Sequence, residues 1–210
     1  MPTQPDAETA ADPIILADYD PRWPSLFEEE RARLQSAIGQ WAADIQHVGS
    51  TSIPGLAAKP IIDIAVHLRS LVDALKCITP LVEQLGYESL GEFGIPDRIY
   101  FRKRTISPLP GQTHTGIGRT HQIHMYELTN EQYDKQIVFR DYLRSHPDAA
   151  REYEALKREL AVRHAGDVEA YAMAKSDFVL EVLDLARVEH AAAAPGPSSH
   201  PAERGAPASR

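Results

Sequence analysis

Apolar residues recur at helical spacing near the start of the chain and at strand spacing after it. The first helix is predicted to begin after the turn-forming residues 20–25 and to end at Gly39. Its apolar face consists of Leu26, Phe27, Leu34 and Ile38. Two strands are predicted next, at 44–48 and 60–68, and the Gly- and Ser-rich loop 49–55 separates them.

The rest of the chain alternates between the same two patterns. A helix capped by Ser70 and interrupted by Pro80 is predicted to end at Gly86, with an apolar face of Val72, Leu75, Ile78, Val82 and Leu85. Strands are predicted at 87–90, 98–104 and 120–128. Three helices are then predicted to begin at a Thr129/Gln132 capping box, at Pro147 and at Asp167. Helices and strands in this order indicate an α+β fold and argue against a Rossmann sheet.

One folded domain is predicted, over residues 14–188. The last 20 residues include seven Ala, four Pro, three Ser and two Gly, so they cannot form an apolar face. We therefore expect a disordered Ala/Pro/Ser-rich tail over 189–210 and a disordered N-terminal tail over 1–13. The stretch 105–119, rich in Gly and Pro, is expected to form a mobile loop.

Composition and charge narrow the class of protein. Hydrophobic residues make up 43% of the 210 positions, which is ordinary for a globular chain, and the formal net charge of −8 argues against general nucleic-acid binding. A single cysteine, Cys77, favours a reducing compartment, and we expect a cytoplasmic protein. No basic segment and only a short apolar run precede Arg22, so neither a signal peptide nor a membrane span is expected.

The loop at 49–55 and the strand after it carry the first candidate chemistry. Gly49 allows close approach of a ligand, and the hydroxyls of Ser50, Thr51 and Ser52 could hold phosphate oxygens, although an ordinary polar turn is the alternative. Asp63 lies on an otherwise apolar strand, on the face opposite Ile62 and Ile64. A carboxylate there needs a metal, a basic residue or hydrogen bonds as partner.

A row of basic residues is the second candidate. Strand alternation places Arg98, Tyr100, Arg102 and Arg104 on one face of the strand 98–104. Arginine suits phosphate because its guanidinium offers two parallel donors, whereas an exposed row of charges on an edge strand is the alternative. Lys59, at the exit of the hydroxyl loop, favours phosphate, so Lys59, Arg98 and Arg102 are predicted to bind an anionic substrate.

Several motifs together resemble those of the GrpB family. The central one runs H-x-G-S-T-S-x-x-G-L-x-x-K-P-I-I-D over residues 47–63, and the likeness covers nearly all of residues 14–187. The others are Y-D-P-x-W-P at 19–24, Y-F-R-K at 100–103, T-H-x-x-H at 120–124, F-R-D-Y-L-R at 139–144 and Y-x-x-x-K at 171–175. The resemblance implies a nucleotidyltransferase-like mixed β-sheet flanked by helices, with a helical C-terminal part.

The same resemblance suggests a divalent metal. Nucleotidyltransferases place a Gly-Ser pair before a strand with two acids at i and i+2, which hold Mg²⁺ over the phosphates. Gly49, Ser50 and Asp63 match this pattern, but the second acid is replaced by Ala65. Histidines would then complete a Mg²⁺ or Mn²⁺ site, and we predict Asp63, His124 and His47 as the metal ligands, with Asp63 also catalytic. No role is predicted for His67 or His121.

The leading prediction is a nucleotidyltransferase-like protein that binds a phosphorylated small molecule or nucleotide, with metal-dependent nucleotidyl or phosphoryl transfer as its reaction. The missing second acid favours the alternative, a non-catalytic binding module for the same ligands. A metal-dependent hydrolase using Asp63 and histidines is a third possibility. A serine hydrolase is least favoured, because the chain lacks the G-x-S-x-G motif. No membrane partner is expected, and the sequence does not predict the oligomeric state.

Overall fold

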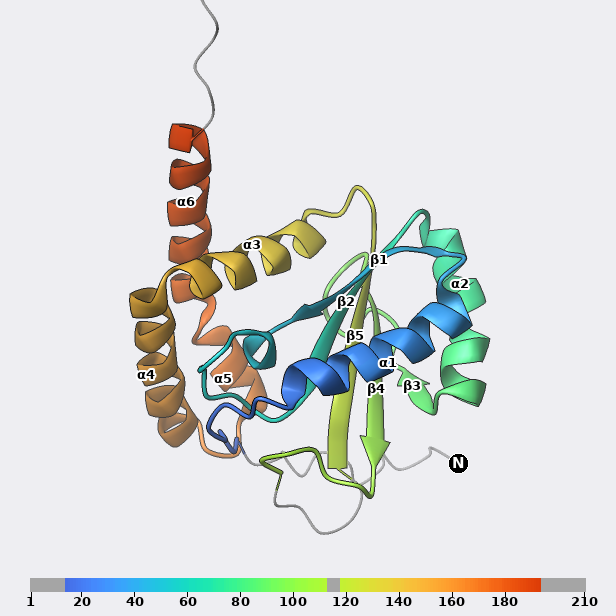
Figure 1. Ribbon diagram of the computed structural model, residues 1–210, viewed down its shortest axis with the longest axis horizontal. Coiled ribbons are helices and arrows are strands. Elements are labelled where there is room, and N and C mark those ends of the chain that lie inside the picture. The colour runs from blue at the N-terminus through green and yellow to red at the C-terminus, as the bar shows by residue number, and fades with distance from the viewer. Residues whose placement is uncertain (1–13, 113–117, 194–210) are drawn as a thin grey trace, which may run out of the picture.

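The computed structural model describes residues 14–112 and 118–193. Within these ranges a five-stranded sheet is flanked by helices (Figure 1). The elements are α1 (Trp23–Ile38), β1 (Ala42–Val48), η1 (Ser50–Ser52), β2 (Ile62–Leu68), α2 (Leu71–Thr79), η2 (Pro80–Gln84), β3 (Tyr87–Ser89), β4 (Ile99–Thr105), β5 (Gly118–Glu127), α3 (Glu131–Ser145), α4 (Pro147–Arg163), α5 (Val168–Met173) and α6 (Ser176–Ala193). None of the helices in these ranges has the length and apolar character needed to cross a bilayer.

The sheet is mixed, as predicted. Its strand order is β1-β2-β5-β4-β3, in which only the central pair, β2 and β5, runs parallel. The parallel register sets Asp63 beside Gln122 and Ala65 beside His124. A parallel pair needs a long crossover, and here α2, β3 and β4 lie between the two strands in the chain. The predicted α+β class and the helical C-terminal part are both confirmed.

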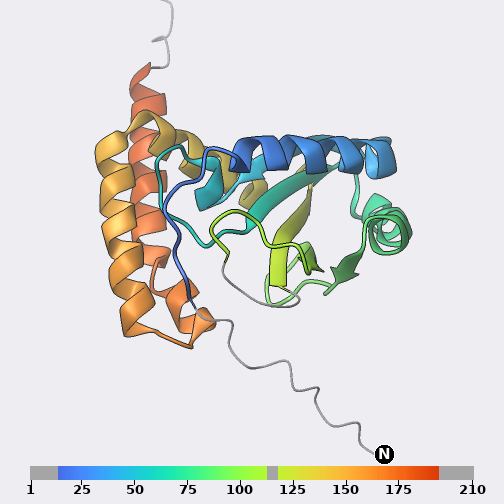
Figure 2. The ribbon, with the colours of Figure 1, turned by 60° about the horizontal axis from the view of Figure 1, so that its bottom comes forward.

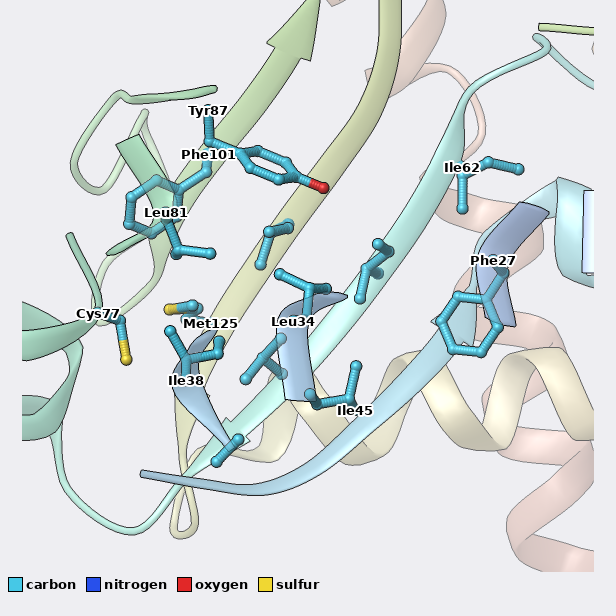
Figure 3. Close-up of a cluster of buried hydrophobic side chains, with 14 of the residues drawn as sticks. Phe27, Leu34, Ile38, Ile45, Ile62, Cys77, Leu81, Tyr87, Phe101 and Met125 are labelled. Atoms are coloured by element: carbon cyan, nitrogen blue, oxygen red, sulfur yellow. The ribbon is translucent and has the colours of Figure 1, made fainter. Parts of the chain in front are cut away.

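One face of the sheet packs against α1 and α2 and forms the main hydrophobic core (Figure 3). Burying each large aliphatic or aromatic side chain of this kind contributes about 1.5–3 kcal/mol. The core includes Phe27, Leu34, Ile38, Ile45, Ile62, Cys77, Leu81, Tyr87, Phe101 and Met125. Figure 2 shows α1 lying along this side of the sheet. The opposite face of β2, which carries Asp63, is left for the functional site.

The other helices cover a different part of the molecule. α3 packs Tyr133 against Val48 and Ala65, on the Asp63 face of the sheet. α4, α5 and α6 gather at one side, beyond β1, whereas α2 and β3 lie at the far side (Figure 1, Figure 2). A second apolar cluster, which includes Leu56, Tyr153 and Val182, joins α3, α4 and α6 to the loop after β1. The site is therefore bounded by the sheet on one side and by the C-terminal helices on the other.

The buried face of α2 and η2 agrees only in part with the predicted one, since Ile78 and Leu85 pack against the core as predicted but the fully buried residues are others. Val72 and Leu75 are each 64% exposed, whereas Ala74, Cys77 and Leu81 are fully buried. Both sets have helical spacing, so the apolar pattern alone allowed either face. The small side chains of Ala74 and Cys77 permit a closer approach to the sheet, and the predicted cap at Ser70 is present.

Two predictions at the C-terminal helices are wrong in detail. Asn130, not Thr129, caps α3, because its side-chain oxygen accepts from the backbone N–H of Gln132 at 2.9 Å. The single helix predicted from Asp167 is two helices, α5 and α6, with Lys175 at the break between them. α6 continues to Ala193, past the predicted domain boundary at 188. The other residues of the two predicted tails, and residues 113–117 of the predicted mobile loop, lie outside the described ranges.

Candidate anion-binding site

A cavity of about 280 Å³ opens on the Asp63 face of the sheet, between the strands and the C-terminal helices. This volume is near the lower end of those that take small-molecule ligands. Its walls come from the loop after β1, from β2, β4 and β5, and from α4, α5 and the break before α6. The lining residues are Ser50, Lys59, Ile61, Asp63, Phe93, Arg98, Tyr100, Arg119, Gln122, His124, Lys157, Val168, Tyr171, Ala172 and Lys175.

The loop after β1 is shaped by its contact with Asp63. Gly49 has φ +68° and ψ −176°, a conformation essentially restricted to glycine. A Cβ at Gly49 would lie 2.9 Å from the Cβ of Asp63 and would collide with its carboxylate. The glycine therefore allows the loop to pass directly over the carboxylate.

The three predicted hydroxyls have different roles. Thr51 Oγ1 donates to the carbonyl of Ile61 at 3.1 Å, and Ser52 Oγ donates to the carbonyl of Gly49 at 2.6 Å. Both side chains are buried and hold the loop in place. Of the three, only Ser50 lines the cavity.

Asp63 is held by neighbours on β5. Oriented so that both of its ends are satisfied, the Gln122 amide donates to Asp63 Oδ1 at 3.0 Å and accepts from the Tyr100 hydroxyl and from Arg119. His124 Nε2 lies 3.7 Å from the same carboxylate oxygen. The side chain of Asp63 remains 28% exposed, so it can also contact a ligand. Three strands thus fix the position of a single accessible carboxylate.

Two lysines that face the cavity come from the helical part. The side chain of Lys157 on α4 is 2% exposed and donates to the carbonyl of Ala57, and burial lowers its pKa to about 7. Lys175 lies over the ring of Tyr171, 4.3 Å from its centroid, and burial together with the charge of Lys59 lowers its pKa to about 8. A buried ammonium without a full set of partners favours an anionic ligand, which would restore the lost solvation.

Sequence reasoning missed Lys157 and gave no role to Lys175. A signal for Lys157 exists in the chain, because it shares one helical face with Tyr153 and Leu160 at i, i+4 and i+7. A lysine in the middle of an apolar stripe is buried with the stripe. For Lys175 the Y-x-x-x-K motif was visible, but a continuous helix was predicted there, which would not place the side chain at a turn.

The predicted basic row is divided between two environments. Arg98 is buried at the cavity, where it donates to the backbone carbonyls of Glu92 and Phe93 and lies 3.4 Å from His124 Nδ1. Arg102 is not among the lining residues, and its guanidinium forms two hydrogen bonds with Glu88 on β3, at 2.6 and 3.1 Å. Lys59 lines the cavity, as does Arg119, which was not predicted.

Of the three predicted metal ligands, Asp63 and His124 lie together at the cavity, whereas His47 does not. Within residues 14–112 and 118–193, no group of three or more His, Cys, Asp and Glu side chains could hold a metal ion. His47 is buried away from the cavity, with Nε2 3.0 Å from Thr51 Oγ1 and its ring stacked on Phe27. Burial lowers the pKa of His47 to about 4, so it is neutral at pH 7.

The other positions do not replace His47. The ring of His67 stacks on Tyr133 at 4.0 Å, and His121 is buried on the opposite face of the sheet. Ala65, where a second acid would stand, is buried in a cluster with Tyr126 and Tyr133. The donors present, one carboxylate and His124, do not fit a two-metal centre built on paired acids.

Gly49→Ala is expected to lower the free energy of unfolding by more than Gly55→Ala does. Both glycines have positive φ, so both substitutions carry backbone strain of about 1–3 kcal/mol. A Cβ at Gly55 meets nothing within 4 Å, whereas one at Gly49 displaces Asp63. Urea unfolding of the two variants measures the difference, and equal losses would show that the loop does not depend on its contact with Asp63.

Comparison with known proteins identifies several chains that are similar to this one. The family model described as "GrpB protein" matches residues 13–185. The UPF0157 protein YqkA of Bacillus subtilis is 40% identical over 79% of this chain, which spans only 44% of the length of YqkA. A crystal structure of the conserved protein GrpB from Enterococcus faecalis aligns over 84% of this chain and 99% of its own, with a TM-score of 0.70 and 34% identity. Cid1 poly(U) polymerase aligns over 76% of this chain and 49% of its own, with a TM-score of 0.48 and 15% identity, and this likeness carries no argument about activity.

Proposed function

The chain belongs to the GrpB family, and we propose that it binds a phosphorylated small molecule or a nucleotide in the cavity beside Asp63. One observation carries the proposal. Five cationic side chains, those of Lys59, Arg98, Arg119, Lys157 and Lys175, line a cavity that contains a single carboxylate.

The charge imbalance is unusual for this chain. Its formal net charge is −8, so composition does not explain why five cationic side chains gather around one carboxylate. Burying Lys157, and partly burying Lys175, near other cations costs free energy, and a bound anion would offset that cost. Phosphate suits the site because arginines offer paired donors and lysines offer mobile ammonium groups to its oxygens.

The cationic side chains of the cavity also bear on which reaction the site supports. Cationic side chains here would neutralise phosphate charge, which in a two-metal transferase is done by the two metal ions that the paired acids hold. Binding without two-metal chemistry is therefore the function that the geometry supports best. No step through a metal ion is derived from these residues.

Nucleotidyl or phosphoryl transfer is the second candidate, and the position of Asp63 favours it. Its carboxylate is oriented by Gln122 and His124 and remains accessible in the cavity. There it would accept the proton of an attacking hydroxyl while the leaving oxygen departs from phosphorus. Incubation with a nucleoside triphosphate, with and without Mn²⁺ and with water standing in for the hydroxyl acceptor, would detect released pyrophosphate or nucleoside diphosphate, and Asp63→Asn should remove that signal.

Calorimetric titration with inorganic tripolyphosphate and with adenosine triphosphate, at pH 6.5, tests the binding proposal. We expect one site per chain for each, and a ligand at 100 times its Kd should add about 2.7 kcal/mol to the free energy of unfolding. The absence of heat and of thermal stabilisation with both compounds would contradict the proposal.

Affinity for tripolyphosphate should fall as the pH rises from 6 to 9. The pKa values of about 7 for Lys157 and about 8 for Lys175 mean that both ammonium groups lose their protons in this range. The ligand itself gains negative charge over the same range, so a fall reports on the protein. Titrations at constant ionic strength measure it, and a rising affinity would show that these lysines do not contact the ligand.

The lowered pKa values of Lys157 and Lys175 predict the opposite pH trend for the free energy of unfolding without ligand. An unfolded lysine has its ordinary pKa of 10.5, so above about pH 7 the unfolded chain binds more protons than the folded one. These two groups therefore make the folded protein more stable as the pH rises from about 7 towards 10.5.

A further inference from the structure

Phe93 is an exposed aromatic residue at the edge of the cavity. It lies in the connection between β3 and β4, lines the cavity, and has 60% of its surface exposed. Its φ of +44° is uncommon for a residue that carries a Cβ. A large apolar side chain in a strained conformation at the mouth of a polar cavity needs a specific reason.

The segment that carries Phe93 is tied down by its neighbours. Arg98 donates to the carbonyl of Phe93 at 2.8 Å and to that of Glu92 at 3.1 Å. Glu92 Oε1 accepts from the backbone N–H of Asp97 at 2.9 Å. Because these bonds fix the backbone, placing a ligand against the phenyl ring would order little additional chain.

One face of the Phe93 ring is already covered by another aromatic ring. It stacks on the buried ring of Tyr100, with ring centroids 5.2 Å apart and an interplanar angle of 18°. Tyr100 in turn belongs to the hydrogen-bonded group around Asp63, through Gln122. The stack thus extends from the centre of the site to its mouth, and its last ring is open to solvent.

Phe93 and the two helical lysines lie at different ends of the cavity, with Arg98 at the Phe93 end. Phe93 belongs to the β3–β4 side of the sheet, whereas Lys157 and Lys175 come from the helices at the opposite side, beyond β1 (Figure 1). A ligand that uses both ends has a planar ring at one end and phosphate groups at the other. Nucleotides have this construction, and simple phosphate esters of aliphatic compounds do not.

We propose that Phe93 stacks on the nucleobase of a nucleotide whose phosphates contact Lys157 and Lys175. This inference rests on the proposed function and adds to it the class of ligand. Because every base has an aromatic face, stacking alone selects nucleotides over other phosphates with little preference among bases.

Calorimetric titration of the parent protein and of Phe93→Ala, with adenosine triphosphate and with tripolyphosphate, tests the proposal. Loss of one stacked base should weaken binding of adenosine triphosphate about tenfold or more, and leave tripolyphosphate within about twofold. Phe93→Trp, which keeps an aromatic face, should bind adenosine triphosphate like the parent. Ile95→Ala, an apolar truncation in the same segment at a residue that does not line the cavity, is the matched control and should change neither ligand.

The outcomes separate this proposal from the one on which it depends. If the parent binds both ligands and Phe93→Ala binds adenosine triphosphate equally well, the stacking proposal is wrong and the anion site stands. If Phe93→Ala weakens both ligands alike, Phe93 supports the segment and does not contact a base. If the parent binds neither ligand, the anion site itself is refuted, and the stacking proposal with it.

Discussion

Glu30→Ala is expected to lower the free energy of unfolding by about 3–5 kcal/mol, because it breaks a buried ion pair from one side. The Glu30 side chain is fully buried on α1. Its carboxylate lies 2.9 Å from Lys103 Nζ and 2.8 Å from Arg33, and it accepts a hydrogen bond from the Tyr87 hydroxyl at 2.9 Å. Burial opposes ionisation, yet Lys103 and its neighbours hold the pKa of Glu30 below its ordinary value.

Removal of Glu30 would leave Lys103 and the Tyr87 hydroxyl without this partner, inside the main core. Urea unfolding measures the loss. Glu28→Ala is the control on the same helix, because Glu28 is exposed and its pair with Arg31 is worth at most about 1 kcal/mol. Equal effects of the two substitutions would contradict the view that this buried cluster holds α1 on the sheet.

The double substitution Lys157→Met and Lys175→Met is expected to weaken tripolyphosphate binding at least about a hundredfold. Each lost charge-assisted hydrogen bond is worth about 1.5–3 kcal/mol, which is roughly 10- to 150-fold in affinity. Stability without ligand should respond differently. Lys175 is only partly buried, and replacing such a cation by an apolar side chain of similar length is often neutral or stabilising, so the free energy of unfolding of Lys175→Met should lie within about 1 kcal/mol of that of the parent.

The matched control is the double substitution Lys76→Met and Lys135→Met. It removes the same number of positive charges from exposed positions on α2 and α3, each of which faces an acidic neighbour one turn away. We expect this control to bind tripolyphosphate like the parent, apart from the small effect of net charge. If both double variants lose affinity equally, the cavity has no special role and only overall charge matters.

The two experiments address charge clusters on opposite faces of one sheet. On the α1 face, Glu30 is balanced by Lys103 and Arg33, so the cluster is complete within the protein. On the Asp63 face, five cationic side chains line a cavity with one carboxylate. A buried cluster in which opposite charges pair contributes to stability, whereas a group of cationic side chains that lines a cavity suits a negatively charged ligand.

Local patterns in the sequence were sufficient to predict most elements of this fold, although not the division between α5 and α6. Helix α1, the strands and the Ser70 cap follow from apolar spacing and capping chemistry, which act between residues close in the chain. Strand alternation also placed Asp63 and His124 on one face of the sheet, because the period of two is fixed by the backbone. Gly49, Ser50 and Asp63 were matched to one motif, and in the structure Gly49 lies against Asp63 while Ser50 lines the same cavity.

Only the tertiary structure decided which of these side chains act together. His47 and Arg102 carry suitable groups, but burial against Phe27 and pairing with Glu88 use them elsewhere, and neither neighbour is close in sequence. Lys157 and Lys175 reach the cavity because the C-terminal helices pack beside the sheet and because α5 and α6 are separated at Lys175. Periodicity records which face of an element is apolar, but contacts between elements depend on how those faces are matched in space. The contribution of Lys157 and Lys175 to the charge of the site therefore depended on how the C-terminal helices pack beside the sheet.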